Sequence, residues 1–363
     1  MKKVLVFGMT ENPGGVESII MNYYRHMDRN RVQFDFLCNS KSIAYEEEIR
    51  NMGGNVYKII SRRENYWRFK KELREFMKIH AKEYAALWVN LCSLVNIDYL
   101  IMAKKYGIVK RIIHCHNSDN DAGFLKGMIH RINKCTVGFF ATDFWSCSES
   151  ASPWFFGTRI MKSAAYKVIP NAIDVEKYEK NEAIRKKYRK ELLLEGKLVI
   201  GHVGRFHFQK NHKFLINVFE TMAKKSPKYH LLLVGQGDLE TEIKQMVREK
   251  DLEDRVTFCG ARTDVENLYQ AMDMLMFPSK FEGLGVVVLE AQANGLPCLL
   301  ASTIPEIVKV NDNVRFLPLD ASLEYWGECA EKMLLSPNTV ENKLKSSEYN
   351  IKVQKSNFEK CIV

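Results

Sequence analysis

The stretch FEGLGVVVLE, residues 281–290, decides how the second half of the chain folds. It follows an apolar run at residues 274–277 that predicts a strand, and it leads into a predicted helix at residues 286–294. Gly283 and Gly285 lie in the turn between them, where glycine lets the backbone come close to a ligand. A helix that begins there presents unpaired N–H groups and the positive end of its dipole. The stretch therefore predicts a strand, a turn and a helix that together suit a phosphate group.

Two carboxylates flank this predicted phosphate site. Glu282 lies in the turn, and Glu290 lies about two turns into the helix. Carboxylates repel an anion, but they accept hydrogen bonds from hydroxyl groups beside it. The alternative is a turn followed by a core helix, with Glu290 as a solvated surface charge. This stretch alone leaves both interpretations open.

A second stretch, VGRFHFQKN at residues 203–211, favours the ligand-binding interpretation. It also follows a predicted strand and precedes a predicted helix. Arg205 and Lys210 place two cations in this loop, and such cations supply the counter-charge that a diphosphate needs. The two stretches together predict a site for a diphosphate and for hydroxyl groups beside it.

Length and composition indicate a globular protein of two domains. The 363 residues are enough for two cores, and 46% of them are hydrophobic while 27% are charged. No segment reaches the ~20 apolar residues that span a bilayer. The nine cysteines occur singly, without zinc or C-x-x-C spacing, so we expect reduced thiols and a cytoplasmic protein. A formal net charge of +10 indicates an acidic partner: nucleic acid, anionic lipid headgroups or a phosphorylated substrate.

Predicted strands and helices alternate along the whole chain. In the first half, strands are expected at residues 3–7, 33–38, 56–59, 86–90 and 111–114. In the second half, they are expected at residues 198–203, 230–234, 256–258, 274–277, 297–301 and 314–317. The pattern predicts an α/β fold with parallel sheets covered on both faces and ligands at the carboxyl ends of the strands. The loop after the first strand lacks G-x-G-x-x-G, so we expect no nicotinamide or flavin site there.

The two motif stretches together resemble the donor half of the family 4 retaining glycosyltransferases. That family carries a GR…K loop and an E-x7-E signature, which are met here by Arg205, Lys210, Glu282 and Glu290. Either motif alone is weak, whereas both in this order and strand context are fairly specific. The resemblance covers nearly the whole chain and is strongest over residues 199–302. The family's usual glycine after the loop lysine is replaced by Asn211, a departure that we expect to matter little.

The resemblance implies a GT-B architecture, in which two facing Rossmann-like, doubly wound domains enclose a cleft. We place the N-terminal, acceptor-binding domain at residues 1–167 and the C-terminal, donor-binding domain at residues 168–345. Residues 346–363 are a possible helix that returns to the first domain. Three motifs narrow the resemblance to the bacterial capsular and exopolysaccharide branch: CS-x-x-A-x-x-W-x-F-G at 147–157, YYR-x-x-D-R at 23–29 and IPN-x-ID at 169–174.

Further site residues follow from the resemblance. Gly14, Gly15 and Glu17 match the family's loop at the acceptor and donor phosphates, although a plain strand-to-helix turn is the alternative. His116, at the end of the fifth predicted strand, matches the histidine that faces the donor sugar, with His114 as the second candidate. These two histidines lack a third metal ligand nearby, so we expect no metal site. Arg262 follows a strand where the resembled enzymes hold the nucleotide base.

The resemblance also implies a mechanism and its substrates. Arg205, Lys210 and the N–H groups of Gly283, Leu284 and Gly285 would neutralise a departing nucleoside diphosphate. Glu290 would accept the ribose hydroxyls, Glu282 would hold the donor hexose, and His116 would complete the catalytic set. The expected donor is a nucleotide sugar, most simply a UDP-sugar, and the expected acceptor is a lipid-linked glycan. No cofactor and no metal are expected, because the two cations replace a divalent ion.

Two segments are both basic and apolar: residues 62–82 and residues 124–145. Such segments favour a peripheral position on the inner face of an anionic cell membrane. An ordinary amphipathic helix with a solvated charged face is the alternative. Nucleic acid is not expected as a partner, because no nucleic-acid motif accompanies the charge. Two rival functions remain: a GT-B epimerase acting on UDP-N-acetylhexosamine, and a non-catalytic protein that binds sugar nucleotides.

Overall fold

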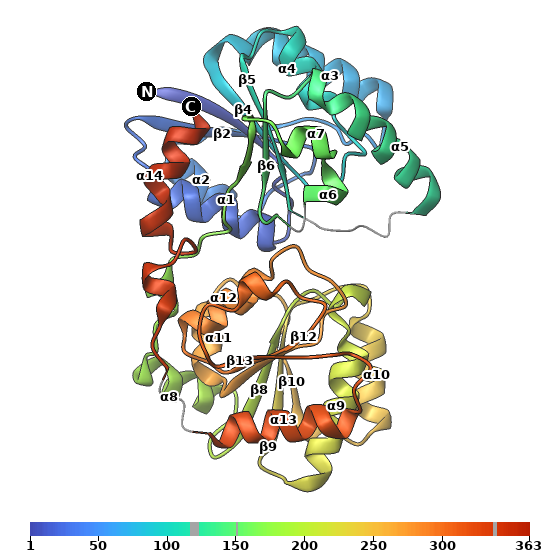
Figure 1. The fold of residues 1–363 in the computed structure, drawn as a ribbon, viewed down its shortest axis with the longest axis vertical. Helices are drawn as coiled ribbons and strands as arrows, with labels where there is room; N and C mark the ends of the chain where they lie inside the picture. Colours follow the sequence, from blue (N-terminus) through green and yellow to red (C-terminus); the bar gives the residue numbers. More distant parts are fainter. Residues whose placement is uncertain (117–122, 150–151, 337–339) are drawn as a thin grey trace. The chain divides into compact units, whose positions relative to one another are not determined.

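The computed structural model describes residues 1–116, 123–149, 152–336 and 340–363. The chain forms two compact units (Figure 1). Unit 1 comprises Met1–Ala172 and Ile351–Val363, and unit 2 comprises Ile173–Asn350. Sequence analysis placed the two limits at residues 167 and 345, so each observed limit lies five residues later along the chain.

Unit 1 contains a seven-stranded parallel sheet in the order β3-β2-β1-β4-β5-β6-β7. Its strands are β1 (Lys2–Phe7), β2 (Val32–Cys38), β3 (Val56–Lys58), β4 (Tyr84–Leu91), β5 (Lys110–Cys115), β6 (Asp143–Ser146) and β7 (Tyr166–Val168). Its helices are α1 (Gly15–His26), α2 (Glu46–Asn51), α3 (Tyr66–His80), α4 (Asp98–Lys105), α5 (Gly123–Thr136), α6 (Ser152–Phe155), α7 (Thr158–Met161) and α14 (Ile351–Ile362). Sequence analysis did not predict β6 and β7. They have four and three residues, and they are defined by pairing with β5 and with each other.

Unit 2 contains a six-stranded parallel sheet in the order β10-β9-β8-β11-β12-β13. Its strands are β8 (Leu198–Val203), β9 (Tyr229–Val234), β10 (Val256–Phe258), β11 (Met274–Phe277), β12 (Cys298–Ala301) and β13 (Val314–Leu317). Its helices are α8 (Glu182–Glu191), α9 (His212–Lys225), α10 (Glu240–Glu249), α11 (Val265–Ala271), α12 (Val286–Ala293) and α13 (Leu323–Leu335). All six predicted strands are present, and the α/β, doubly wound fold class is confirmed in both units.

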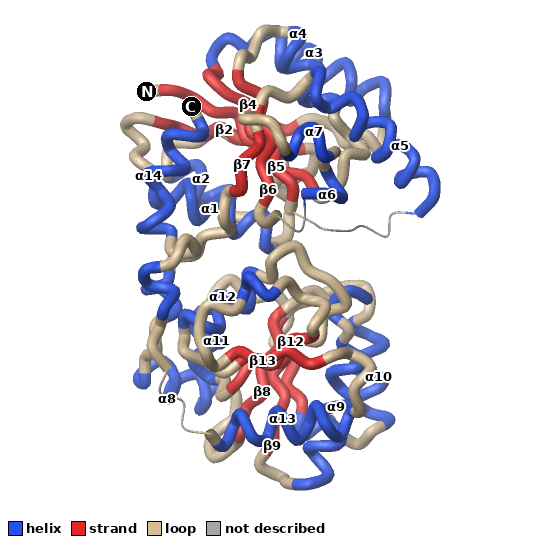
Figure 2. Tube along the Cα trace, in the orientation of Figure 1, coloured by secondary structure: helices blue, strands red, loops and turns tan. Residues whose placement is uncertain are grey.

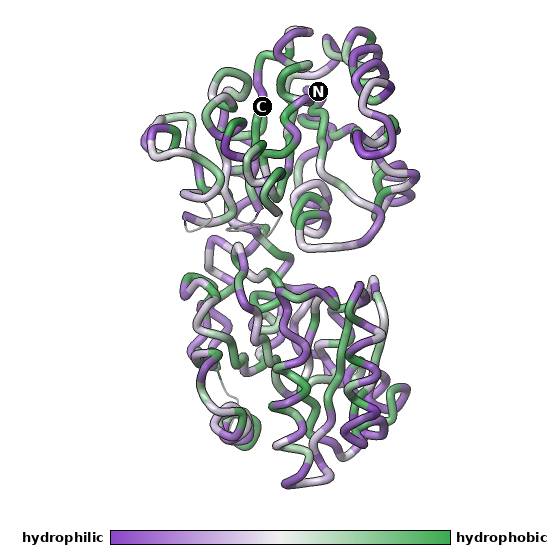
Figure 3. The backbone as a smooth tube through the Cα atoms, turned by 90° about the vertical axis from the view of Figure 1, so that its right-hand side faces the viewer, coloured by the Kyte–Doolittle hydropathy of each residue, from purple (hydrophilic) through white to green (hydrophobic). Residues whose placement is uncertain are grey.

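Each sheet lies between helices, which explains the near-continuous apolar strands (Figure 2). All residues of β2 and of β9 are buried, as expected where both faces of a parallel sheet are covered. Asp35 is a polar residue inside β2, and its carboxylate accepts hydrogen bonds from the Tyr84 hydroxyl and the Asn55 amide. Hydrophobic residues follow the strands, whereas the outer helices alternate between hydrophobic and hydrophilic residues (Figure 3).

The C-terminal helix α14 belongs to unit 1 and packs against α1. Phe358 of α14 is buried, and its ring stacks on that of Tyr23 with 3.9 Å between centroids. The same ring meets Trp88 of β4 edge-on at 5.2 Å. Such aromatic pairs contribute about 1 kcal/mol each beyond the area that they bury. One aromatic residue thus anchors the last segment of the chain to the sheet of unit 1.

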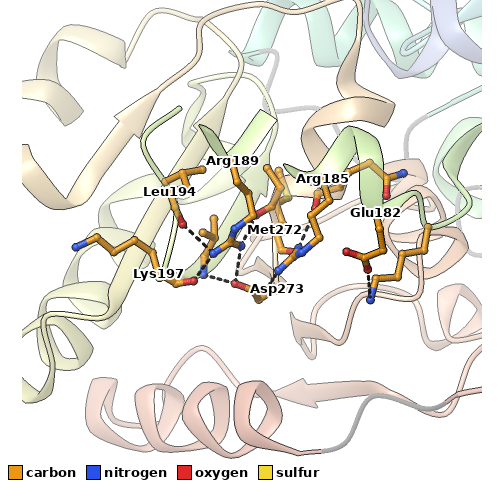
Figure 4. Close-up of polar contacts among 11 residues, drawn as sticks. Glu182, Arg185, Arg189, Leu194, Lys197, Met272 and Asp273 are labelled. Atoms are coloured by element: carbon orange, nitrogen blue, oxygen red, sulfur yellow. Dashed lines mark hydrogen bonds and ion pairs between the residues drawn. The ribbon is translucent and has the colours of Figure 1, made fainter. Parts of the chain in front are cut away.

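Two arginines of α8 fix the amino-terminal ends of β8 and β11 (Figure 4). Asp273, the residue before β11, accepts from Arg185 at 2.5 Å and from Arg189 at 3.2 Å. The same carboxylate accepts from the backbone N–H of Val199 in β8 at 2.7 Å. This network holds the two central strands at one end, while the loops that carry the two motifs leave from their other end.

Candidate active site

The order of strands in unit 2 reverses between β8 and β11. In open α/β sheets, ligands bind where the loops after two such neighbouring strands diverge. The loop after β8 contains residues 204–211, and the loop after β11 contains residues 278–285. Both motifs identified in the sequence therefore lie at the place where the topology predicts a ligand.

Lys210 and Glu282 bring the two loops together. The Lys210 ammonium lies 2.7 Å from Glu282 Oε1, and the two side chains are only 16% and 9% exposed. The ammonium also lies 4.6 Å from the centroid of the Phe277 ring, at the end of β11. Between the same loops, Gln209 donates through Nε2 to the Phe281 carbonyl at 2.9 Å. A largely buried ion pair thus sits at the switch point, where it is held rigidly.

Arg205 differs from Lys210 in its exposure to solvent. Its side chain is 65% exposed, and its nearest carboxylate, that of Asp238, lies 3.4 Å away and is itself 78% exposed. Such a surface pair contributes little to stability, so the guanidinium remains available to an incoming anion. The loop therefore presents one cation fixed by the fold and one directed to solvent.

Asn211 has a left-handed backbone, with φ 57° and ψ 43°. This conformation explains why a glycine is usual at this position in the resembled family. Asparagine adopts the left-handed region more readily than most other residues, because its short side chain can hydrogen-bond locally. The loop therefore reaches α9 with asparagine in place of glycine.

The turn at residues 283–285 leads into α12. Gly285 has φ +82°, a backbone conformation that L side chains rarely adopt, and it is the N-cap of the helix. The Leu284 side chain is buried, which leaves only its backbone for a ligand to contact. The first N–H groups of α12 have no partner within the helix. This geometry matches the phosphate-binding turn that the sequence predicts.

Glu290 is buried rather than solvated. It is 8% exposed, and its two carboxylate oxygens accept hydrogen bonds from the hydroxyls of Tyr178, at 3.0 Å, and Tyr269, at 2.8 Å. Burial raises the pKa of Glu290, and the two tyrosine hydrogen bonds partly oppose this rise. The alternative of a solvated surface charge is therefore wrong. The tyrosines could not be found from spacing, because they lie 112 and 21 residues away in the sequence.

Two further residues near Lys210 were missed by sequence analysis. His202 in β8 and His212 at the start of α9 are buried, and their rings meet edge-on, with an interplanar angle of 74° and 4.7 Å between centroids. Burial lowers the pKa of His202 to about 4 and that of His212 to about 2. Both rings are therefore neutral at physiological pH, and they add no charge beside Lys210.

Arg262 is engaged by its own loop. It donates to Asp264 through Nε and Nη2, both at 2.7 Å, and Asp264 also accepts from the Tyr188 hydroxyl at 2.6 Å. The Arg262 hydrogen bonds are the main cause that lowers the pKa of Asp264 to about 2. Arg262 thus shapes the loop after β10, and its contact with a nucleotide base stays a prediction.

In unit 1, Glu17 folds back onto the loop that precedes its helix. Its carboxylate accepts from the N–H of Thr10 at 2.9 Å, from the hydroxyl of Thr10 at 2.7 Å and from the N–H of Gly14 at 3.2 Å. A Cβ atom at Gly14 would lie 2.8 Å from Glu17 Oε2, whereas one at Gly15 would meet nothing within 4 Å. A Cβ atom at Gly14 would therefore displace the end of the Glu17 side chain, and a ligand contact for all three residues stays a prediction.

The structure places His116 and His114 in different surroundings. Nε2 of His116 donates to Asn90 Oδ1 at 2.8 Å, and Asn90 in turn donates to the carbonyl of Phe7. Burial lowers the pKa of His116 to about 3. His114 is fully buried against Trp88 and its two ring nitrogens have no hydrogen-bond partner among the described residues. His116, at the strand end, remains the candidate of the two, and its catalytic role is still a prediction.

The sequence predicts no metal site and no segment that spans a bilayer. Within residues 1–116, 123–149, 152–336 and 340–363, no group of three or more His, Cys, Asp or Glu side chains is placed to hold a metal ion. No helix in the described parts of the chain is long and apolar enough to cross a bilayer.

Of the branch motif at residues 147–157, Ser150 and Ala151 lie outside the described residues, while Phe155 and Phe156 are core side chains.

Comparison with solved structures identifies the fold. The chain superimposes on the crystal structure of Anabaena Alr3699/HepE in complex with UDP and glucose with a TM-score of 0.81, at 19% identity, covering 99% of both chains. Two doubly wound units of this kind are the GT-B fold.

Comparison with curated sequences identifies the family. Residues 184–322 match the family described as glycosyl transferases group 1. The chain is 32% identical to EpsF of Bacillus subtilis (strain 168), named as a glycosyltransferase, over 90% of this chain and 86% of that protein. The chain therefore belongs to the group 1 glycosyl transferases, and the resemblance drawn from its motifs is confirmed.

Two further relatives match parts of the chain. One is the Staphylococcus aureus capsular polysaccharide biosynthesis glycosyltransferase CapM, 29% identical over 58% of this chain and 57% of that protein. The other is the Escherichia coli UDP-Gal:alpha-D-GlcNAc-diphosphoundecaprenol alpha-1,3-galactosyltransferase, 33% identical over 37% of this chain and 36% of that protein. These names support the bacterial polysaccharide branch of the family.

Proposed function

We propose that the protein is a retaining glycosyltransferase that moves a hexose from a UDP-sugar to a lipid-linked glycan during capsular or exopolysaccharide biosynthesis. The observation that carries the proposal is the arrangement at the β8–β11 switch point. There, Lys210 pairs with Glu282 at 2.7 Å, Arg205 faces solvent in the same loop, and α12 begins at a left-handed glycine. Cations and backbone N–H groups converge where a departing diphosphate would lie.

The chemistry needs stabilisation mainly on the leaving side. The bond from the anomeric carbon to a diphosphate oxygen breaks, and a bond to the acceptor oxygen forms on the same face of the sugar. The acceptor proton passes to the departing diphosphate, whose charge grows in the transition state. Lys210, held by Glu282, and the N–H groups at the start of α12 are oriented before the reaction begins, and Arg205 in the same loop adds an exposed cation. Preorganised groups of this kind stabilise the developing charge without reorganisation.

Glu290 is suited to hold the ribose of the nucleotide. Its two oxygens already accept from Tyr178 and Tyr269, which fix the orientation of the carboxylate. Each oxygen keeps a second lone pair, so the same carboxylate can accept from two adjacent hydroxyl groups. Glu282, held by Lys210, would contact hydroxyls of the donor hexose, and by the family resemblance His116 is the proposed histidine for that hexose.

The substrates are proposed from the relatives and from charge. The Escherichia coli relative is named for a UDP-Gal donor and an acceptor linked to diphosphoundecaprenol, and HepE was crystallised with UDP and glucose. The net charge of +10 suits an acceptor presented at an anionic membrane. We therefore place the protein in the cytoplasm, at the inner face of the cell membrane, with its basic and apolar segments against the lipid.

The decisive experiment is a donor screen. Purified protein is incubated with UDP- and GDP-sugars, native membranes and acceptor lipid, and both nucleotide release and the glycolipid product are measured. Transfer from one UDP-sugar with retention of the anomeric configuration is the expected result, and it should persist in EDTA because two cations already balance the diphosphate. Release of free or epimerised sugar without a glycolipid product would contradict the proposal. Loss of activity in EDTA that magnesium restores would contradict metal independence alone.

A further inference from the structure

Helix α5 presents its apolar residues to solvent. Phe124, Met128 and Ile132 lie on successive turns of one face and are 86%, 46% and 57% exposed. Leu125 beside them is 69% exposed, and Phe139 in the following turn is 69% exposed. Exposed hydrophobic residues are ordinary when they are scattered, but a contiguous group of large ones marks an interaction surface. We call these five residues the α5 stripe.

The opposite face of α5 is polar, and it holds the helix on unit 1. His130 accepts from the N–H of Leu94 at 3.1 Å, and its other ring nitrogen donates to the Trp154 carbonyl at 3.2 Å. Asn133 donates to the carbonyl of Leu94, and Lys134 donates to that of Trp154 at 3.0 Å. An ordinary surface helix turns its apolar face toward the core and its polar face toward solvent. Helix α5 does the opposite.

The other basic and apolar segment behaves in the usual way. Helix α3 buries Phe69, Leu73, Phe76 and Met77 against unit 1, and its exposed Trp67 and Ile79 lie near opposite ends of the helix. Its cations are also partly neutralised: Arg68 pairs with Glu72 at 2.7 Å, and Lys70 pairs with Asp98 at 2.6 Å. Helix α3 thus offers no continuous apolar surface, and part of its positive charge is paired.

The charges carried by α5 itself have one sign. Gly123–Thr136 contains Lys126, Arg131 and Lys134 but no Asp or Glu, whereas Asp119 and Asp121 stand in the sequence just before the helix. Lys126 and Arg131 are exposed, while Lys134 is engaged with the carbonyls of Pro153 and Trp154. A helix that carries large exposed apolar side chains and exposed cations is complementary to an anionic bilayer, whose headgroups attract the cations while its acyl region accepts the apolar groups.

We propose that α5 is the membrane-binding element of the protein and inserts the α5 stripe into the headgroup–acyl boundary of an anionic bilayer. The inference deepens the proposed function, because it names the surface by which the enzyme would meet a lipid-linked acceptor. It also replaces α3 as the principal membrane contact. Binding of this kind has an electrostatic part that salt weakens and a hydrophobic part that remains.

The test is the binding of full-length protein to vesicles of phosphatidylglycerol and phosphatidylcholine, measured by sedimentation. A variant with Phe124→Ser, Leu125→Ser, Met128→Ser and Ile132→Ser is expected to bind at least about tenfold more weakly, since it removes most of the apolar area available for insertion. These side chains are exposed, so the variant is expected to fold, which its melting curve checks. Wild-type affinity in a folded variant would overturn the proposal.

The matched control removes four equally exposed apolar residues elsewhere: Val109→Ser, Ile307→Ser, Leu335→Ser and Val353→Ser. Their side chains are 80%, 48%, 67% and 50% exposed. We expect this control to bind vesicles like the wild type, and an equal loss in both variants would contradict a specific role for α5. A second comparison reverses Arg68, Lys71, Arg74 and Lys78 of α3 to Glu. If the α3 variant no longer bound vesicles while the α5 variant still did, α3 would be the membrane-binding helix.

Insertion is measured directly with Phe124→Trp. Its fluorescence is expected to shift to shorter wavelength with anionic vesicles, relative to the wild-type spectrum, and part of the shift should survive high salt. A second copy of the chain is the competing occupant. Dimerisation of the wild type that the α5 variant abolishes, without vesicle binding by either form, would establish that occupant and overturn the proposal.

Failure of the inference and failure of the proposed function can be told apart. UDP affinity and transfer to a water-soluble acceptor analogue need no contact with a bilayer, so the α5 variant should retain both while losing transfer to acceptor lipid in vesicles. Vesicle binding without any transfer would contradict the enzyme and support the α5 surface. Full transfer to vesicle-borne lipid by the α5 variant would contradict the α5 surface and leave the enzyme intact.

Discussion

The loop after β1 and the loop after β8 occupy the same place in two sheets of the same topology, yet they use their charged side chains in opposite ways. In unit 1, Glu17 turns inward and accepts three hydrogen bonds from Thr10 and Gly14 of its own loop. In unit 2, Lys210 reaches the neighbouring loop and Arg205 faces solvent. Topology sets where a loop lies, whereas its side chains decide whether it organises itself or binds a ligand.

The difference separates stability from chemistry. A carboxylate whose hydrogen bonds all stay within one loop mainly stabilises that loop, so its loss should be seen in unfolding. A cation that faces solvent at a switch point contributes little to folding and should be seen in catalysis. The comparison between the two loops is therefore tested by measuring both stability and transfer activity on variants of each loop.

The largest effect is expected from the cations of the β8 loop. Lys210→Ala and Arg205→Ala should each lower kcat/KM for transfer about a hundredfold, because removing a preorganised contact to the departing diphosphate costs ~3 kcal/mol of barrier. Lys213→Ala is the control: it removes a lysine three residues further on, which is 57% exposed and paired with Glu242. Activity within threefold of wild type in either variant would contradict the proposal that this loop contacts the diphosphate.

The corresponding change in unit 1 should act on stability. Glu17→Ala removes three hydrogen bonds from a residue that is 5% exposed, so the free energy of unfolding of unit 1 should fall by about 2 kcal/mol. Denaturant unfolding measures this loss, and UDP titration of the same variant should give the wild-type dissociation constant. A stable variant that loses transfer activity would show that Glu17 contacts a substrate, and the contrast between the loops would disappear.

A smaller effect, with a pH signature, is expected at Glu290. Glu290→Gln should weaken UDP binding about tenfold while changing turnover less, because ribose contacts are similar in the ground and transition states. The ribose hydroxyls need the carboxylate, and burial raises the pKa of Glu290. Wild-type affinity should therefore be lost as pH falls through a midpoint above that of an ordinary glutamate. Calorimetric titration with UDP at a series of pH values is the measurement. If Glu290→Gln lost affinity at low pH in the same way as the wild type, another group would be responsible for the loss.

The raised pKa of Glu290 has the opposite effect on the stability of the folded protein: stability falls as pH rises, whereas UDP affinity falls as pH drops. The folded protein holds the proton of Glu290 more tightly than the unfolded chain does, so deprotonation costs stability as pH rises through the raised pKa. His202 and His212 act oppositely, since burial lowers their pKa values to about 4 and about 2. Their contribution is present above their unfolded pKa near 6.5 and is lost as pH falls toward the folded values.

The smallest effect is expected at Asn211. Asn211→Gly should change the free energy of unfolding by less than about 1 kcal/mol, because both residues tolerate the left-handed backbone, with φ 57°. Asn211→Val should cost more, since a β-branched residue resists this conformation. Thermal melting of both variants measures the difference. Equal melting temperatures would mean that the loop does not need its left-handed turn.

Unit 2 was easier to predict from sequence than unit 1. Its six strands are apolar runs bounded by polar residues, and its two motif loops follow β8 and β11 directly. In unit 1, β6 and β7 were missed: both are short, and they are defined by pairing with β5 and with each other at one side of the sheet. The motif residues Arg205, Lys210, Glu282 and Glu290 were found because fixed spacing within single loops and helices is visible in a sequence.

By itself, the sequence determined the alternation of strands and helices, the positions of the two motif loops and the family. These depend on local properties: apolar periodicity, glycine in a turn, and charge spacing along a few residues. Only the tertiary structure decided the partners of those residues. Tyr178 and Tyr269 meet at Glu290, Asn90 meets His116, and α5 turns its apolar side outward. Such contacts join residues far apart in the chain, and a helix pattern shows that one face is apolar without saying which way that face is turned.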